Sequence, residues 1–189
     1  MKLAIFGGTF DPVHCAHLTV AREAAARFGL DKVVFVPAGN PPHKELSTGA
    51  SFENRCRMVE LACAGEPAFS VSRIEEGPAP SYSIRTIESL RASLGRDDQL
   101  YFVIGADAFA EIDTWHRAED VVRNVDFIVV TRPGHDYVTP DGARVHRLDT
   151  VALPVSSSEI RVKLAARGEP AELPPAVLGY IREKRLYRD

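Results

Sequence analysis

The sequence predicts an α/β fold, a doubly wound and mostly parallel sheet with helices on both faces. Short apolar runs rich in β-branched and aromatic residues alternate with segments of helical periodicity. Near-continuous apolar strands separated by helices are typical of a parallel sheet whose two faces are both covered. A length of 189 residues suits one domain with a sizeable core, so we expect residues 1–189 to form a single domain.

Five apolar runs predict the strands of this Rossmann-like sheet. They lie at Leu3–Phe6, Val33–Val36, Phe69–Val71, Leu100–Ile104 and Phe127–Val130. Two further stretches, residues 37–50 and 132–144, are dense in Pro, Gly, Asn and Asp and are predicted as loops. Loops of this length in a compact domain are more often functional than idle.

Periodic apolar stripes predict the helices between the strands. One stripe comprises Leu18, Ala21, Ala25 and Phe28 and ends before Gly29, and another comprises Ile84, Ile87, Leu90 and Leu94 and ends before Gly95. Both glycines stand where a C-cap is expected. Near the C-terminus Ser156 and Glu159 fit a capping box, with Ile160 and Leu164 as a buried stripe and Gly168 and Pro170 as the end. We expect the segment of about 156–189 to be helical and to pack on the domain.

Composition and charge exclude several classes of protein. A net charge of −3 argues against broad nucleic-acid binding, which needs a basic face. No apolar run approaches membrane-spanning length, and the chain enters a strand at once without a leader, so we expect neither membrane insertion nor secretion. Three cysteines are an odd count, and Cys56 and Cys63 share one helical pattern in which they do not readily bridge. The sequence therefore predicts a cytoplasmic protein.

The most informative segment is GGTFDPVHCAH at residues 7–17, between the first strand and the first helix. Two glycines let the backbone approach a ligand, and a strand-to-helix turn presents free N–H groups to an anion. His14 and His17 fall on one face of the first helical turn. Two other interpretations compete: a metal cluster with Cys15, which would point away from that face, and histidines that only cap the helix or fill the core.

Two other segments add cations and hydroxyl groups. Lys44 follows the second strand, at the edge of the sheet where α/β proteins bind ligands, although an exposed surface lysine is the simpler interpretation. Ser156, Ser157 and Ser158 with Arg161 either form a well-capped helix start or a phosphate site. The sequence alone leaves both alternatives open.

Two residues suggest contacts with a nucleoside. Asp107 follows Gly105 directly after the fourth strand, where it either caps a short helix or accepts hydrogen bonds from a ribose. Trp115 is the only tryptophan and has polar and charged neighbours on both sides. It is either a core residue or a platform for stacking a flat ring.

Taken together, these motifs resemble those of the bacterial nicotinate-nucleotide adenylyltransferase family, in the nucleotidyltransferase superfamily with its GxFxPxHxGH signature. The resemblance covers essentially the whole chain: GGTFDPVHCAH, NPPHK at 40–44, SYS at 81–83, GAD at 105–107, TW at 114–115, TRPG at 131–134 and SSSEIR at 156–161. Ala16, Ser83 and Arg85 depart from the residues that the family more often has there, glycine, threonine and aspartate.

The resemblance implies a set of binding residues. ATP is expected to contact Gly7, Gly8, Thr9, Phe10, His14, His17, Gly105, Asp107, Ser157 and Arg161. The mononucleotide is expected to contact Lys44, Ser81, Tyr82, Ser83, Trp115 and Arg132. Mg²⁺ is the expected cofactor, carried by ATP rather than by protein ligands.

The expected reaction is attack by a phosphate oxygen of nicotinate mononucleotide on the α-phosphorus of ATP, which gives deamido-NAD and pyrophosphate. No covalent nucleophile is needed, so the protein positions two anions and neutralises the charge between them. We expect His17 and Lys44 to act on the α-phosphate, and His14, Arg161 and Mg²⁺ on the pyrophosphate. The alternatives are a phosphopantetheine or nicotinamide-mononucleotide adenylyltransferase and a non-catalytic nucleotide-binding regulator; a homo-oligomer is also possible.

Overall fold

The five apolar runs of the chain and one polar segment form a six-stranded sheet in which every neighbouring pair is parallel, in the order β3-β2-β1-β4-β5-β6. The computed structural model describes residues 1–40, 49–132, 134–150 and 155–188. The strands are β1 Lys2–Gly8, β2 Lys32–Pro37, β3 Phe69–Val71, β4 Gln99–Gly105, β5 Asp126–Thr131 and β6 Arg144–Asp149. The predicted α/β fold is confirmed.

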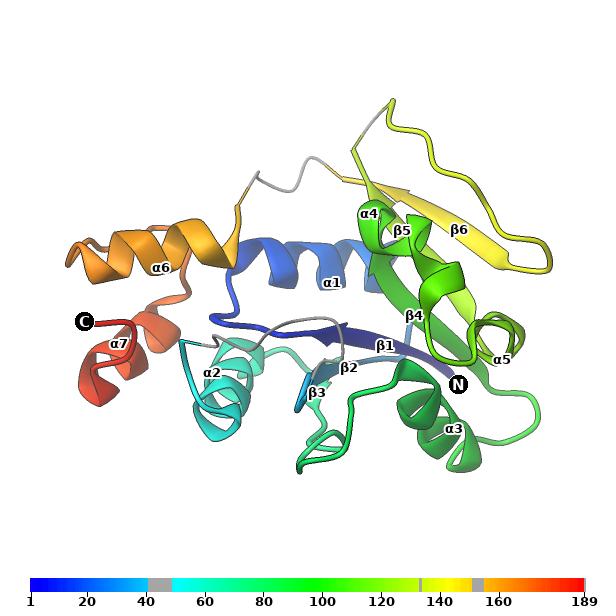
Figure 1. The fold of residues 1–189 in the computed structure, drawn as a ribbon, viewed down its shortest axis with the longest axis horizontal. Coiled ribbons are helices and arrows are strands. Elements are labelled where there is room, and N and C mark those ends of the chain that lie inside the picture. Colours follow the sequence, from blue (N-terminus) through cyan, green and yellow to red (C-terminus); the bar gives the residue numbers. More distant parts are fainter. Residues whose placement is uncertain (41–48, 133, 151–154, 189) are drawn as a thin grey trace.

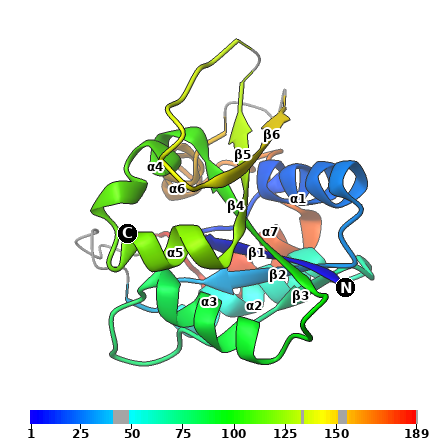
Figure 2. The ribbon, with the colours of Figure 1, turned by 90° about the vertical axis from the view of Figure 1, so that its right-hand side faces the viewer.

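Helices connect most of these strands. They are α1 Cys15–Phe28, α2 Phe52–Cys63, α3 Ser83–Ala92, α4 Ala106–Ala110, the 3₁₀ turn η1 Ile112–Thr114, α5 Ala118–Asn124, α6 Ser157–Ala165 and α7 Pro175–Lys184. Figures 1 and 2 show α1 on one face of the sheet, and α3 and α5 on the other. Within the described residues, none of these helices combines the length and apolar character needed to span a bilayer.

Successive side chains of a strand point to opposite faces of the sheet, so alternate residues of each strand pack into two separate hydrophobic cores. On β4, Tyr101 and Val103 pack with α1, α2, α6 and α7, whereas Leu100, Phe102 and Ile104 pack with α3, α4 and α5. The predicted stripe residues Ile160 and Leu164 of α6 are buried in the first core, together with Val177 and Ile181 of α7. The C-terminal helices thus cover the same face as α1.

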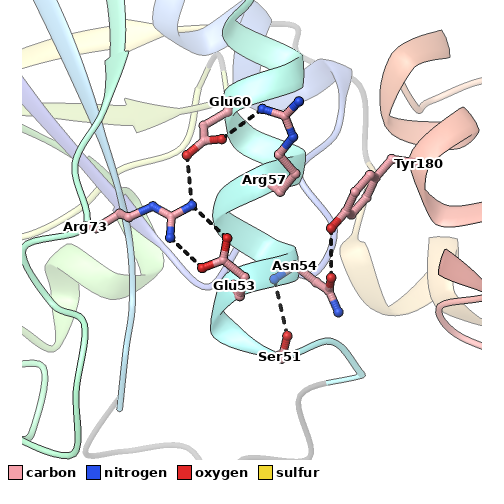
Figure 3. A network of polar contacts seen from close by, with 7 residues as sticks. All are labelled: Ser51, Glu53, Asn54, Arg57, Glu60, Arg73 and Tyr180. Carbon is pink, nitrogen blue, oxygen red and sulfur yellow. Dashed lines mark hydrogen bonds and ion pairs between the residues drawn. The ribbon is translucent and has the colours of Figure 1, made fainter.

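Capping signals are confirmed for some helices and not for others. Gly29 has φ 62° and ends α1 as a left-handed cap. Ser156 begins α6, and Ser51 begins α2 by accepting the Asn54 N–H (Figure 3). The predicted cap at Gly95 is wrong, because α3 ends at Ala92 and its C-cap is Ser93, whose own hydroxyl donates to the Leu90 carbonyl.

The sequence analysis did not predict strand β6. β6 lies at the edge of the sheet beside β5, and only Leu148 among its residues is fully buried. Its residues Arg144, His146 and Arg147 are polar, so the strand lacks the apolar run that marked the others. An edge strand with one partner can carry such side chains because one side of it faces solvent.

Candidate functional site

The carboxyl end of β1 leads directly into the turn that carries both histidines. His14 is the N-cap of α1, and its ring lies 3.8 Å from that of His17, measured between ring centroids. The His14 backbone N–H donates to Nδ1 of His17 at 3.1 Å. The two side chains therefore share one face, as predicted, and the capping interpretation holds for one nitrogen of His17.

This hydrogen bond decides the protonation of His17. Because a backbone N–H can only donate, Nδ1 must accept, and the ring proton of neutral His17 then resides on Nε2. Burial first, and then the adjacent His14, hold the pKa of His17 well below its usual range. His17 consequently presents an uncharged N–H donor at neutral pH.

His14 has a buried ring nitrogen without a hydrogen-bond partner in the described part of the chain. The residue is 4% exposed, and its Nδ1 has no hydrogen-bond partner among the described residues. Burial lowers the pKa of His14 to about 4, so this ring is also neutral. A buried unpaired ring nitrogen is costly, and a polar group bound at this turn would remove that cost.

The first turn of α6 reaches the same loop from the far end of the chain (Figure 1). Ser157 donates its hydroxyl proton to the Pro12 carbonyl at 2.9 Å, and Arg161 donates from Nη1 to the Asp11 carbonyl at 2.7 Å. Arg161 has five N–H donors, so several are left for an anion. Ser157 has one proton, so in this arrangement it holds the loop.

The side chain of Phe10 is buried, whereas the sequence analysis expects Phe10 to contact ATP. Its side chain is 2% exposed and packs edge-on against His17, with ring centroids 5.0 Å apart. A Cβ at Gly8 would lie 3.0 Å from the Phe10 ring, which explains a glycine at this position. Only the backbone of Phe10 remains for a contact with ATP.

Two cavities flank the carboxyl end of β4. The first, of about 240 Å³, lies on the side of β1 and β2. Its walls include Gly7, Gly8, Ser81, Ser83, Gly105 and Trp115. Trp115 packs edge-on against Phe102 and lines the cavity, so it is a wall as well as part of the core.

The second cavity, of about 520 Å³, lies on the side of β5. Its lining includes Val20, Gly105, Asp107, Thr131 and Arg132. Asp107 is exposed in the first turn of α4, whose cap is Gly105 without any side-chain hydrogen bond, so the capping interpretation of Asp107 is not supported. Gly105 borders both cavities and marks their junction. The first cavity also includes Gly7 and Gly8, which lead into the histidine turn.

Two predicted mononucleotide residues do not line the first cavity with the others. Arg132 lines the second cavity with Asp107, not the first with Trp115. Tyr82 stacks on His116 at 4.2 Å between ring centroids rather than lining the first cavity. Lys44 lies outside the described residues. Among the departures from the family pattern, Ser83 lines the first cavity, whereas Arg85 lies over the Tyr82 ring and does not.

The sequence analysis missed several groups at this site. Glu75 lines the first cavity and accepts a hydrogen bond from Thr86, which is 4% exposed. Arg55, 2% exposed on α2, donates to the Thr9 carbonyl at 2.7 Å. No local pattern signals either contact, because both partners are distant along the chain.

The described residues of this site offer few oxygen atoms as ligands for Mg²⁺. The described residues contain no group of three or more His, Cys, Asp or Glu side chains that could hold a metal ion. Mg²⁺ prefers oxygen ligands, whereas the histidine pair offers nitrogen, and the buried Asp11 carboxylate already has three donors. These side chains fit an ion that is held mainly by phosphate oxygens.

The fold and site define a nucleotide-binding α/β protein, and the comparison with known families gives its class. A family model described as cytidylyltransferase-like matches residues 5–163, most of the chain.

Comparison with individual relatives identifies the family within that class. A protein of Solibacter usitatus named "Probable nicotinate-nucleotide adenylyltransferase" is 60% identical over 187 residues, which cover 99% of this chain and 100% of that relative. A protein of Pelobacter propionicus with the same name is 41% identical, covering 100% and 99%. The chain belongs to the nicotinate-nucleotide adenylyltransferase family of cytidylyltransferase-like proteins.

Solved structures agree on the fold. The nicotinic acid mononucleotide adenylyltransferase of Plasmodium falciparum complexed with NaAD superposes with a TM-score of 0.78, covering 98% of this chain and 97% of that one. The two sequences are 20% identical, so this likeness shows a common fold.

Proposed function

We propose that the protein transfers the adenylyl group of ATP to nicotinate mononucleotide, forming deamido-NAD and pyrophosphate. The observation that carries this proposal is the pair of cavities that share Gly105, the first of which also includes Gly7 and Gly8 at the start of the histidine turn. The cavity with Trp115 suits a pyridine nucleotide, and the cavity with Asp107 suits adenosine. Two nucleotides bound in this way would bring their phosphates together at the junction.

The phosphate-binding roles follow from the available donors. In the reaction an oxygen of the mononucleotide phosphate bonds to the α-phosphorus as the bond from that phosphorus to the pyrophosphate oxygen breaks. His17, with its proton on Nε2, would donate to the α-phosphate as charge builds up on it. Arg161 would bind the departing pyrophosphate through its remaining N–H groups, and the unpaired His14 would add a further contact.

Other parts of the assignment extend this proposal. Lys44 is assigned to the α-phosphate, and Ser81 and Ser83 to the nicotinate ring. Arg132 is better placed to contact the adenosine side, because it shares a cavity with Asp107. Mg²⁺ carried by ATP would neutralise negative charge on the triphosphate.

Pyrophosphate release tests the proposal directly. The purified protein is incubated with ATP and Mg²⁺ plus nicotinate mononucleotide, nicotinamide mononucleotide or phosphopantetheine in separate reactions. We expect turnover to be fastest with nicotinate mononucleotide. Faster turnover with phosphopantetheine would assign a different acceptor, and no turnover with any of the three would favour a nucleotide-binding regulator.

A further inference from the structure

A buried carboxylate lies at the centre of the phosphate loop, defined here as residues 9–12. Asp11 is 3% exposed, and its two oxygens accept three hydrogen bonds. The backbone N–H groups of Gly49 and Ala50 donate at 2.8 Å and 3.2 Å, and the hydroxyl of Tyr187 donates at 2.6 Å. Asp11 therefore connects the phosphate loop with two segments that are remote in sequence.

The backbone of the same loop is fixed by other side chains. The carbonyls of Thr9, Asp11 and Pro12 accept hydrogen bonds from Arg55, Arg161 and Ser157 respectively. These donors come from α2 and from the first turns of α6. The loop geometry is thus set by contacts that converge from several elements, with Asp11 at their centre.

Tyr187 is the member of this network that the proposed reaction does not use. It lies beyond α7, and its ring packs so closely on the chain that a Cβ at Gly49 would lie 2.6 Å from it. Burial first, and then the hydrogen bond to Asp11, raise the pKa of Tyr187, so the hydroxyl keeps its proton at neutral pH. It is a permanent donor to the carboxylate.

We propose that Tyr187 is a positioning residue for ATP, which acts through Asp11 to hold the phosphate loop and Arg161 in their binding geometry. The inference rests on the proposed function, since it assigns a role within the same phosphate site. It makes the C-terminal segment part of the nucleotide site, although Tyr187 itself need not touch the substrate.

The physical reason is a competition for the Arg161 guanidinium. In the native arrangement the Tyr187 hydroxyl donates to Asp11 Oδ1, whereas Arg161 donates to the Asp11 backbone carbonyl and to the Ser158 hydroxyl. Without the hydroxyl, Oδ1 retains only the longer bond from Ala50. A charged acceptor that has lost a donor attracts nearby cations. Arg161 already donates to the backbone carbonyl of the same residue, so we expect its guanidinium to be drawn from the phosphates to the carboxylate.

The test compares two tyrosines that each lose one hydroxyl group. Tyr187→Phe removes the bond to Asp11 and keeps the ring. Tyr180→Phe is the matched control: this half-buried tyrosine on α7 donates to Asn54 on α2 at 2.8 Å (Figure 3), and not to a residue of the phosphate loop. We expect both variants to lose similar thermal stability. Only Tyr187→Phe should raise KM for ATP, by about tenfold, with KM for the mononucleotide nearly unchanged.

Equal KM values for ATP in the two variants and the wild type would overturn the inference while leaving the proposed function intact. If the wild-type protein itself showed no turnover, the proposed function would fail, and the inference would be tested by calorimetric titration with a non-hydrolysable ATP analogue. In that titration a weaker affinity of Tyr187→Phe, relative to Tyr180→Phe, supports the inference. The same affinity in both variants contradicts it.

Discussion

A single histidine illustrates how residue chemistry determines this site. The two ring nitrogens of His17 have different tasks, since Nδ1 accepts the N-cap N–H of α1 and Nε2 carries the proton. A glutamate or glutamine usually makes the first contact at this helical position. A histidine there adds a donor on the opposite side of the ring, and its lowered pKa keeps that donor uncharged. Orientation and protonation are therefore fixed before any ligand binds.

Substituting His17 separates these two tasks. We expect His17→Ala to lower kcat by roughly 10²–10³-fold, the usual loss for one oriented transition-state donor, and to cost about 1 kcal/mol of stability through the lost cap. His17→Glu restores an acceptor for the N-cap N–H but has no donor, so it should recover stability and not activity. Steady-state kinetics and urea unfolding measure both effects. A His17→Ala protein with near-normal kcat would show that His17 only caps the helix.

The buried rings predict how stability depends on pH. Unfolded His14 binds a proton near its ordinary pKa of 6.5, whereas native His14 does so only near pH 4. Between these values the unfolded chain holds more protons, so the free energy of unfolding falls as the pH is lowered from about 6.5 to about 4. His14 alone contributes a slope of at most about 1.4 kcal/mol per pH unit.

Urea unfolding at about pH 5 and pH 7 checks this slope. The carboxylates also titrate near pH 5, so the informative quantity is the difference between variants. His14→Gln should reduce the loss of stability between the two pH values, and substituting the exposed His135 with Gln should leave it unchanged. An equal loss in His14→Gln and wild type would mean that native His14 titrates normally.

At the scale of elements, turn and cap residues carried the most reliable sequence signals. Gly29 and Ser156 were placed correctly because each requires only local backbone geometry. Gly95 was misplaced because a neighbouring hydroxyl ended α3 before the glycine was reached. β6 was missed because it is a polar strand stabilised by pairing with β5, and that pairing is not visible in a local hydrophobic pattern.

The first turn of α6 gives an element-scale prediction. Arg161 both holds the Asp11 carbonyl and offers donors to phosphate, so Arg161→Ala should raise KM for ATP and also lower kcat. Arg161→Lys should recover only part of the loss, because a single ammonium cannot make both contacts in the geometry of the guanidinium. Steady-state measurement of KM for ATP and of kcat in both variants tests this prediction. Complete recovery by lysine would show that charge alone is required.

At the scale of the whole molecule, the sequence predicted the fold, and two cavities lie at the edge of the sheet where ligands are expected, but the sequence did not predict the contacts that shape the site. Asp11 and Tyr187 are 176 positions apart, and Thr86 and Glu75 meet across a loop. Such pairs depend on how the chain folds back, and a motif search examines only neighbours in sequence. For the same reason the sequence did not show that two cavities share the end of β4, or that Arg132 lines the second of them and not the first.

The first cavity, assembled from β1, the chain around Ser81, α3 and Trp115, predicts the choice of mononucleotide. Nicotinate and nicotinamide differ by a carboxylate against an amide, which stacking on Trp115 does not distinguish. Hydroxyl groups of Ser81 and Ser83 can donate to a carboxylate, and the Ser81 oxygen already accepts the Asn40 N–H, which leaves its proton for a ligand. A buried amide NH₂ left unpaired costs about 1–3 kcal/mol, so we expect at least tenfold preference for nicotinate mononucleotide in kcat/KM.

This preference depends on keeping Glu75 from opposing the substrate carboxylate. Thr86 donates its hydroxyl proton to Glu75 Oε1 at 2.7 Å, which orients the only acidic side chain lining the cavity among the described residues. Thr86→Val keeps the shape of the side chain but frees the carboxylate, which would repel nicotinate and accept the N–H of nicotinamide. The ratio of kcat/KM for the two mononucleotides should therefore fall in Thr86→Val.

In Trp115→Ala the kcat/KM values for both mononucleotides should decrease while most of their ratio remains, because the lost stacking serves both rings equally. An unchanged ratio in Thr86→Val, or a ratio near one in Trp115→Ala, would show that specificity arises from stacking on Trp115 and not from the polar side chains of the cavity.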